Sequence, residues 1–247
     1  MTGWDELRRE LDLWAARGEA PALWWRDDDA VEPSTALERA MALAEAAAVP
    51  LALAVIPAAN RLTAADLSGP VTAVQHGYAH RNHAGPKAKK CELGAERRAD
   101  HVIAELMTGR HVLEQSFGDS FRPVLVPPWN RLGAHLPAML PELGYIGLSR
   151  FGARDRPAIG AMRIVNAHID IIDWQGSRGF VGTETALART VGQLRARRES
   201  AADPAEATGL LTHHRVHDAG CWDFLENLFA VTAASGLAKW RSATSLF

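Results

Sequence analysis

Apolar runs that are long enough to be buried strands alternate along this chain with segments of helical periodicity. Residues 51–56 read Leu-Ala-Leu-Ala-Val-Ile, which is typical of a strand buried on both faces. The other expected strands cover 22–26, 71–74, 124–126, 145–149, 163–168, 209–213 and 238–243. The expected helices that follow the first strand cover 35–48, 95–116, 132–143, 183–198 and 222–234. Short connections between alternating strands and helices favour a parallel α/β sheet.

The length of 247 residues, without an internal repeat or a low-complexity linker, predicts one domain over 1–247. At this length, the alternating pattern predicts a sheet that closes or nearly closes into a β/α barrel. A helix over about 3–18 precedes the first strand, because apolar residues recur there at helical spacing and Gly18 follows them.

The bulk properties exclude several classes of protein. The net charge is −2 and the basic residues are dispersed, which predicts no nucleic-acid partner. No apolar stretch reaches membrane-spanning length, and the first residues contain no apolar core of a signal peptide. Two cysteines are too few for a disulfide framework. We therefore expect a cytoplasmic protein that binds neither nucleic acid nor a membrane, with its oligomeric state left open.

Two histidines, His76 and His80, follow the expected strand at 71–74 and are four residues apart. Their imidazoles can face one point, and neutral imidazole is the commonest metal-binding side chain. Such a pair alone is more often a surface or capping feature. The carboxylate triplet Asp27-Asp28-Asp29 follows the first expected strand, and α/β folds place their sites at strand ends. The two features together predict a divalent-metal site.

Five short motifs occur in an order that resembles one family. They are Trp25-Arg26-Asp27-Asp28-Asp29, His76-Gly77-Tyr78-Ala79-His80, Val126-Pro127-Pro128-Trp129-Asn130, Asp170-Ile171-Ile172-Asp173-Trp174 and Leu211-Thr212-His213-His214. In this order they are similar to the motifs of the polysaccharide deacetylases, the NodB-homology or carbohydrate esterase family 4 proteins. The resemblance covers residues 25–214. It implies a distorted (β/α)7–8 barrel and metal-dependent hydrolysis of an N-acetyl amide, usually on an amino sugar.

The resemblance also implies a role for individual residues. Asp27 corresponds to the general base and His213 to the general acid. Metal binding falls to Asp28, His76 and His80. The expected ion is zinc, with cobalt, nickel or manganese as alternatives. Substrate contacts are expected from Pro128, Trp129 (whose amide would be an oxyanion donor), Trp174 and Leu211, and supporting roles from Arg26, Arg131 and Asp173.

The chemistry of these residue types agrees with such a reaction. An Asp-His-His site leaves coordination positions open for water and a carbonyl oxygen. Hydrolysis of an amide needs a base and an acid on separate groups, because one proton leaves the water and another arrives at the amine.

The chain also departs from the family pattern. Val126 stands where the third motif usually has an arginine that steadies the catalytic aspartate, and Arg26 or Arg131 is the expected replacement. Asp29 replaces the usual glycine, and its charge would raise the pKa of the base. Further pocket candidates are His83, His168, His214 and His217. These departures favour a small intracellular amide or N-acylated sugar over an extracellular polymer.

Two other functions fit parts of the pattern. Two histidines and one carboxylate also suit a non-haem Fe(II) enzyme, although the motif order and the extra Asp27 and His213 argue against it. A non-catalytic carbohydrate-binding relative would explain Val126, but it would not explain why the expected base and acid are present.

Overall fold

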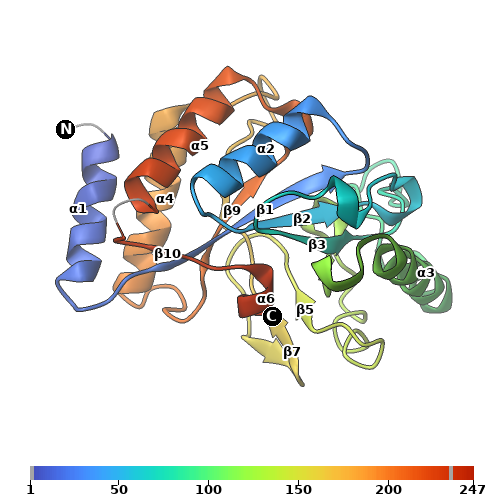
Figure 1. Ribbon diagram of the computed structural model, residues 1–247. Helices are drawn as coiled ribbons and strands as arrows, with labels where there is room; N and C mark the ends of the chain where they lie inside the picture. Colours follow the sequence, from blue (N-terminus) through green and yellow to red (C-terminus); the bar gives the residue numbers. More distant parts are fainter. Residues whose placement is uncertain (1–2, 234–235) are drawn as a thin grey trace.

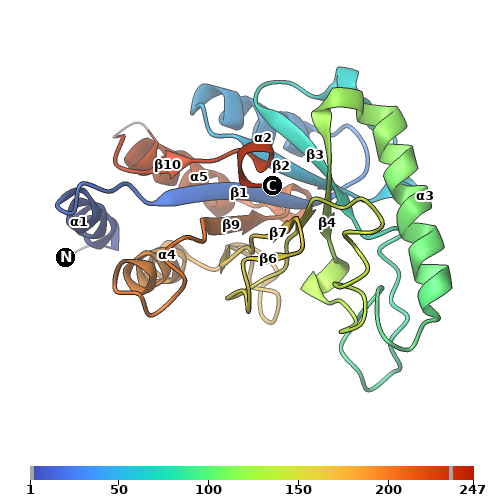
Figure 2. The ribbon, with the colours of Figure 1, turned by 90° about the horizontal axis from the view of Figure 1, so that it is seen from below.

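The computed structural model describes residues 3–233 and 236–247, and a single curled sheet lies at its centre (Figures 1 and 2). The strands are β1 (Ala22–Ala30), β2 (Leu51–Val55), β3 (Val71–His76), β4 (Phe121–Val126), β5 (Gly147–Leu148), β6 (Ala158–Ile159), β7 (Met162–Ile164), β8 (Ile169–Asp170), β9 (Thr208–Thr212) and β10 (Lys239–Trp240). Their order is β6-β7-β5-β4-β3-β2-β1-β9-β8, and β10 pairs with the start of β1. Only β6 and β7 pair antiparallel among the described strands.

The helices surround this sheet. They are α1 (Gly3–Ala15), α2 (Thr35–Ala46), α3 (Ala99–Phe117), α4 (Thr183–Arg198), α5 (Ala219–Thr232) and the short α6 (Ala243–Leu246). In Figure 1, α2 and α5 lie over the sheet, α3 lies beyond β3, and α1 lies beside α4. None of the described helices is both long and apolar enough to span a lipid bilayer.

The two ends of the sheet approach each other through the segment that follows β7. The amide of Ala167 donates to the carbonyl of Arg150, 2.9 Å away and just beyond β5, while the amide of His168 donates to Gly209 on β9 at 2.7 Å. This segment therefore links both sides of the sheet and leaves the barrel distorted and nearly closed. The predicted fold class is confirmed.

The carboxyl ends of β1, β3, β4, β8 and β9 meet at one end of the barrel, because these strands run parallel. Parallel α/β sheets place their sites at this end. Every motif identified in the sequence falls at the end of one of these strands. The sheet thus brings together residues that are almost 200 positions apart.

Several predicted elements differ in extent. The first strand continues to Ala30, through the carboxylate triplet, instead of ending at residue 26. The stretch 132–143 forms successive turns instead of a helix, because Pro137 and Pro141 lack the amide donors that a helix needs. The hydroxyl of Ser34 caps the start of α2 by accepting from the amide of Leu37 at 3.2 Å. Residue 234, the predicted end of the last long helix, lies outside the described residues.

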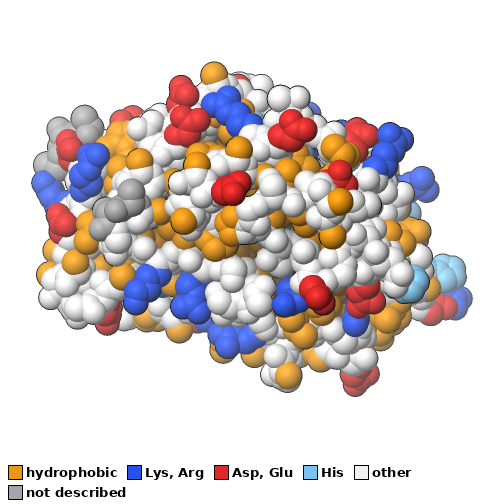
Figure 3. All heavy atoms as spheres, viewed as in Figure 1, with side chains coloured by type: hydrophobic (Ala, Val, Ile, Leu, Met, Phe, Trp, Pro, Cys, Tyr) orange, Lys and Arg blue, Asp and Glu red, His pale blue; other side chains and the backbone are white. Residues whose placement is uncertain are grey.

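Side chains of both charges are interspersed with apolar ones over the face shown in Figure 3. No large area of a single sign covers that face. Cys91 and Cys221 are both free thiols.

We expect α1 to contribute to stability through its buried face. Leu11 is fully buried, whereas Leu13 on the same helix is 43% exposed. Leu11→Ala should lower the free energy of unfolding by about 2–5 kcal/mol, and Leu13→Ala should change it by less than about 0.5 kcal/mol. Urea denaturation measures both values. Equal effects of the two substitutions would contradict the packing of α1 against α4.

Candidate metal centre and its pocket

A β-bulge near the end of β1 sets the directions of the three consecutive carboxylates. Side chains alternate between the two faces of a strand, so Arg26 and Asp28 share one face and Asp27 lies on the other. The pairing of β1 with β2 shifts register between Asp27 and Ala30. At Asp29 the backbone is left-handed, with φ of 72°. These irregularities bring Asp29 to the carboxyl end of β3, where the two histidines lie.

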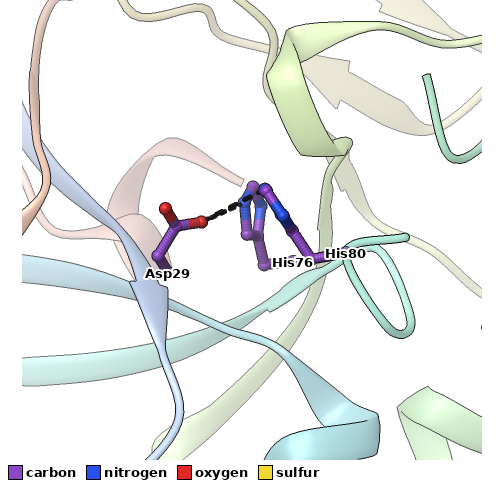
Figure 4. Close-up of side chains that lie close together, drawn as sticks. All are labelled: Asp29, His76 and His80. Atoms are coloured by element: carbon purple, nitrogen blue, oxygen red, sulfur yellow. Dashed lines mark hydrogen bonds and ion pairs between the residues drawn. The ribbon is translucent and has the colours of Figure 1, made fainter. Parts of the chain in front are cut away.

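Asp29, His76 and His80 form a compact group of metal-ligand atoms (Figure 4). The Oδ1 atom of Asp29 lies 3.1 Å from Nε2 of His76 and 3.3 Å from Nε2 of His80. One ligand atom from each of the three residues lies within 4.8 Å of the others. One carboxylate and two imidazoles suit zinc and neighbouring divalent ions. The donor set therefore fits the metal that the sequence predicts.

A contact with the backbone orients His76 for this role. The Nδ1 atom of His76 lies 3.0 Å from the carbonyl oxygen of Val126, and a carbonyl only accepts, so Nδ1 carries the proton. In the neutral form of His76 the lone pair is then on Nε2, the atom that faces Asp29 and is available to a metal ion. The pKa of Asp29 is lowered, because its contacts with the histidines, His76 foremost, outweigh the effect of burial.

Glu92 fixes the loop that joins the two histidines, and the sequence analysis did not identify it. Its buried carboxylate accepts from the amides of Tyr78 at 3.1 Å and Ala79 at 2.7 Å. Gly77 has φ of 57°, and a Cβ there would lie 2.1 Å from Oε2 of Glu92. A single glutamate in an irregular segment gives no periodic signal, so only its burial reveals this role.

Asp28, the predicted metal ligand, does not join the group that the two histidines form with Asp29. Its Oδ2 accepts from Nη2 of Arg26 at 3.0 Å, and its Oδ1 lies 2.9 Å from Nε of the same arginine. Arg26 is fully buried and also donates to Ser149 Oγ and Asn130 Oδ1, both at 2.7 Å. Arg26 thus contacts an aspartate, as expected of a replacement arginine, but that aspartate is Asp28. Arg131 instead donates to a backbone carbonyl.

Asp27, the predicted general base, lies on the opposite face of β1 and does not line the pocket. Its Oδ2 accepts from Thr212 Oγ1 at 2.6 Å and from the amide of His214 at 2.9 Å, and its Oδ1 lies 2.5 Å from Nδ1 of His214. Both carboxylate oxygens are therefore occupied. Burial acts to raise the pKa of Asp27, but His214 outweighs it and the pKa is lowered. The pKa of His214 is raised by Asp27, despite burial.

A pocket of about 720 Å³ opens above the candidate metal centre. It is lined by Asp28, Asp29, His76, His80, Lys90, Trp129, Asn130, Arg131, Phe151, Asp170, Trp174, Arg178 and His213. His213 makes an edge-to-face contact with Trp174, with ring centroids 4.7 Å apart. Its own Nδ1 atom is buried and has no hydrogen-bond partner among the described residues. The predicted residues that line the pocket are Asp28, His76, His80, Trp129, Arg131, Trp174 and His213.

The chain has no sequence match to a protein-family model or to a curated protein. Solved structures are similar in fold. A protein from Mycobacterium smegmatis assigned to the polysaccharide deacetylases superposes with a TM-score of 0.63 at 17% identity, over 92% of this chain and 88% of that one. A family 4 carbohydrate esterase from Streptomyces lividans, in complex with acetate, superposes with a TM-score of 0.57 at 13% identity, over 89% of this chain and 91% of that one. A family 4 acetyl xylan esterase from Clostridium thermocellum, in complex with a cobalt ion, superposes with a TM-score of 0.54 at 14% identity. The match covers 92% of this chain and 90% of that one.

The fold is that of the polysaccharide deacetylases. The resemblance stated from the five motifs is therefore confirmed at the level of fold. At these identities the likeness does not transfer residue roles, so the site depends on the contacts within this chain.

Within this polysaccharide deacetylase fold, other predicted residues lie outside the pocket. Asp173 caps a turn by accepting from the amides of Gly176 at 3.0 Å and Ser177 at 3.2 Å, and Asp170 lines the pocket in its place. The pKa of Asp170 is raised by burial. The residues Pro128, Leu211, His83, His168, His214 and His217 are likewise absent from the pocket lining.

Backbone strain is concentrated at this pocket. Among the described residues, seven non-glycine residues have a positive φ, and five of them line the pocket: Asp29, His80, Trp129, Asn130 and Arg178. Such conformations cost about 1–3 kcal/mol each and cluster at functional sites. The local sequence alone would not select them, so the surrounding contacts impose them.

We expect the Asp27–His214 pair to make stability depend on pH. The folded-state pKa of His214 is raised above its ordinary value of 6.5, so its protonation stabilises the fold. His214→Gln should therefore lower the free energy of unfolding by about 3–5 kcal/mol below pH 6.5. This deficit should shrink as the pH rises through the raised pKa, because the wild type then loses the charge. Urea denaturation between about pH 6 and 9 measures it.

His217 provides the matched control. Burial lowers its pKa to about 4, so it is neutral throughout this pH range. The deficit caused by His217→Gln should not change with pH above 6.5. A deficit for His214→Gln that is constant or grows with pH would contradict the charged pair.

Proposed function

We propose that this protein is a metal-dependent hydrolase of an amide C–N bond, which removes the acetyl group from an N-acetylated sugar or another small N-acyl compound. The convergence of Asp29, His76 and His80 at the base of a pocket that also contains Asp28 and His213 is the observation that carries this proposal. The similarity in fold to deacetylases and esterases supports it.

Asp29, His76 and His80 would hold a divalent ion, with zinc as the first candidate and cobalt, nickel or manganese as alternatives. Such an ion supplies polarisation of the amide carbonyl and a lowered pKa for a bound water. The protein's own residues account for substrate orientation and proton transfer.

Asp28 takes the role of general base in this proposal. It lines the pocket next to Asp29, and its Oδ1 atom is 2.9 Å from Nε of Arg26, in an ion pair without a well-aligned hydrogen bond among the described residues. That oxygen can accept the proton of the attacking water. Arg26, which contacts both carboxylate oxygens, fixes the orientation of Asp28 and replaces the arginine that the third motif lacks.

His213 takes the role of general acid. It enters the pocket from the end of β9, whereas Asp28 comes from the end of β1. Base and acid are therefore separate groups, as amide hydrolysis requires. Protonation of the departing nitrogen by His213 would release the amine, while Trp129 and Trp174 line the pocket around the substrate. The amide of Trp129 remains the proposed oxyanion donor.

The buried Arg26 weakens the alternative of a non-catalytic carbohydrate-binding relative. That alternative rested on Val126, which leaves the third motif without its arginine. Because Arg26 already contacts Asp28 from within β1, the site does not lack an arginine. The Fe(II) alternative explains neither the Arg26–Asp28 pair nor the presence of His213 in the pocket.

We expect metal binding to distinguish between neighbouring carboxylates. Asp29→Asn and His80→Ala should each weaken metal affinity by at least about tenfold, because they remove a ligand atom. Asp28→Asn should retain the metal, because Asp28 contacts Arg26. Metal content after dialysis against a dilute chelator measures this difference. Metal loss from Asp28→Asn, with retention in Asp29→Asn, would restore Asp28 as the ligand.

We expect catalysis to depend on Asp28 while metal binding does not. Acetate release from N-acetylglucosamine, with zinc present, should fall by about 10²–10⁴-fold in Asp28→Asn, since a positioned base contributes about this much. Acetate release should fall by a similar factor in His213→Ala. Full activity of Asp28→Asn would contradict the assignment of the base, even if the metal site is correct.

A further inference from the structure

One wall of the pocket combines a histidine, an aromatic ring and a cation. The ring of Trp129 contacts His80, with centroids 4.3 Å apart, and the Lys90 ammonium lies 5.9 Å from the centroid of Trp129. Arg131 lies beside them, and its Nη1 donates to the carbonyl of Lys90 at 2.7 Å. Two cations therefore lie at the edge of this wall.

A second wall repeats this arrangement. Trp174 contacts His213, and the guanidinium carbon of Arg178 lies 5.9 Å from the centroid of the Trp174 indole ring. Both Trp174 and Arg178 are exposed, and both line the pocket. A substrate that reaches the metal ligands and His213 must pass these two aromatic and cationic walls.

The turn that carries Arg178 is ordered by specific contacts. Arg178 has φ of 60°, a conformation that non-glycine residues seldom adopt. Its amide donates to the carbonyl of Asp173 at 2.9 Å, and the carboxylate of Asp173 caps the same turn. The strained backbone thus places a cation at the pocket edge, and Asp173 has a positioning role there.

These three cations have no carboxylate partner among the described residues. Lys90, Arg131 and Arg178 form no ion pair there, whereas exposed arginines elsewhere do so, such as Arg39 with Glu226 at 3.0 Å. The acidic groups of the pocket are already engaged. Asp28 pairs with Arg26, Asp29 contacts the histidines, and Asp170 accepts from the Trp174 indole at 2.8 Å. The positive charge at the pocket edge is therefore available to a ligand.

We propose that the substrate is an N-acyl amino sugar that carries a negatively charged group, a carboxylate or a phosphate, which Arg178 and the Lys90–Arg131 pair recognise. This inference rests on the proposed function and specifies its substrate. Lysine and arginine bind both kinds of anion. The aromatic rings contact the uncharged part of the sugar, and a pocket of about 720 Å³ has the size of a small-ligand site.

The test compares binding of three probes to the zinc-loaded protein. The probes are N-acetylglucosamine, N-acetylglucosamine 6-phosphate and N-acetylmuramic acid, and calorimetry is performed on Asp28→Asn so that no probe is consumed. At least one anionic sugar should bind about tenfold or more tightly than the neutral one at low salt. The preference should shrink in about 0.5 M NaCl, because salt screens exposed charges. The anionic probe that binds more tightly shows whether the site recognises a phosphate or a carboxylate.

Substitution of the edge cations should remove this preference selectively. In the same background, Arg178→Gln and Lys90→Gln should each weaken binding of the preferred anionic sugar by about 3–10-fold, since these are solvent-exposed charges. Binding of N-acetylglucosamine should weaken less, so that the preference for the anionic sugar shrinks. Arg163→Gln and Lys239→Gln are matched controls, because both residues are exposed and lie outside the pocket. Neither control should alter the preference.

Binding and turnover separate the two proposals. Equal binding of charged and neutral sugars, or no binding of either anionic probe, would overturn the inference whether or not the wild type releases acetate. A preference that Arg178→Gln and Lys90→Gln leave intact would also overturn it. Absence of acetate release from every probe would count against the deacetylase proposal, while a charge preference that these variants abolish would still support an anionic ligand.

Discussion

The bulge at the end of β1 separates three consecutive carboxylates, and the rest of the site depends on that separation. Asp27 pairs with His214, Asp28 with Arg26, and Asp29 with the two histidines. A buried carboxylate without a partner costs several kcal/mol, so three adjacent carboxylates in one strand require three different environments. The strand alternation provides two of them, and the bulge provides the third.

Each of these environments has a different consequence. The Asp27–His214 pair joins β1 to the segment after β9 behind the pocket. The Arg26–Asp28 pair links β1 to the ends of β4 and β5 through Asn130 and Ser149. Asp29 alone reaches the histidines. The same strand thus contributes a structural pair, an oriented carboxylate and a candidate metal ligand from adjacent positions.

The sequence predicts the barrel and the location of the site, because both depend on patterns that span many residues. Alternating apolar and amphipathic segments predict the parallel sheet, and the motifs at strand ends predict where the pocket lies. The sequence does not show that Asp29, and not Asp28, lies beside the histidines, because a bulge leaves no mark in an Asp triplet and a single-residue shift turns each side chain to another face. Glu92 and the pairing of Asp27 with His214 depend on contacts between distant segments. Local patterns do not encode such contacts.

The most direct measurement is the coordination sphere of the metal-loaded protein, observed by anomalous diffraction at the zinc edge. We expect a single ion with Asp29, His76 and His80 as its protein ligands at about 2.0–2.2 Å, and Asp28 still in contact with Arg26. An ion coordinated by Asp28, with Asp29 turned away from the histidines, would contradict the role of the bulge and the arrangement of the catalytic groups that follows from it.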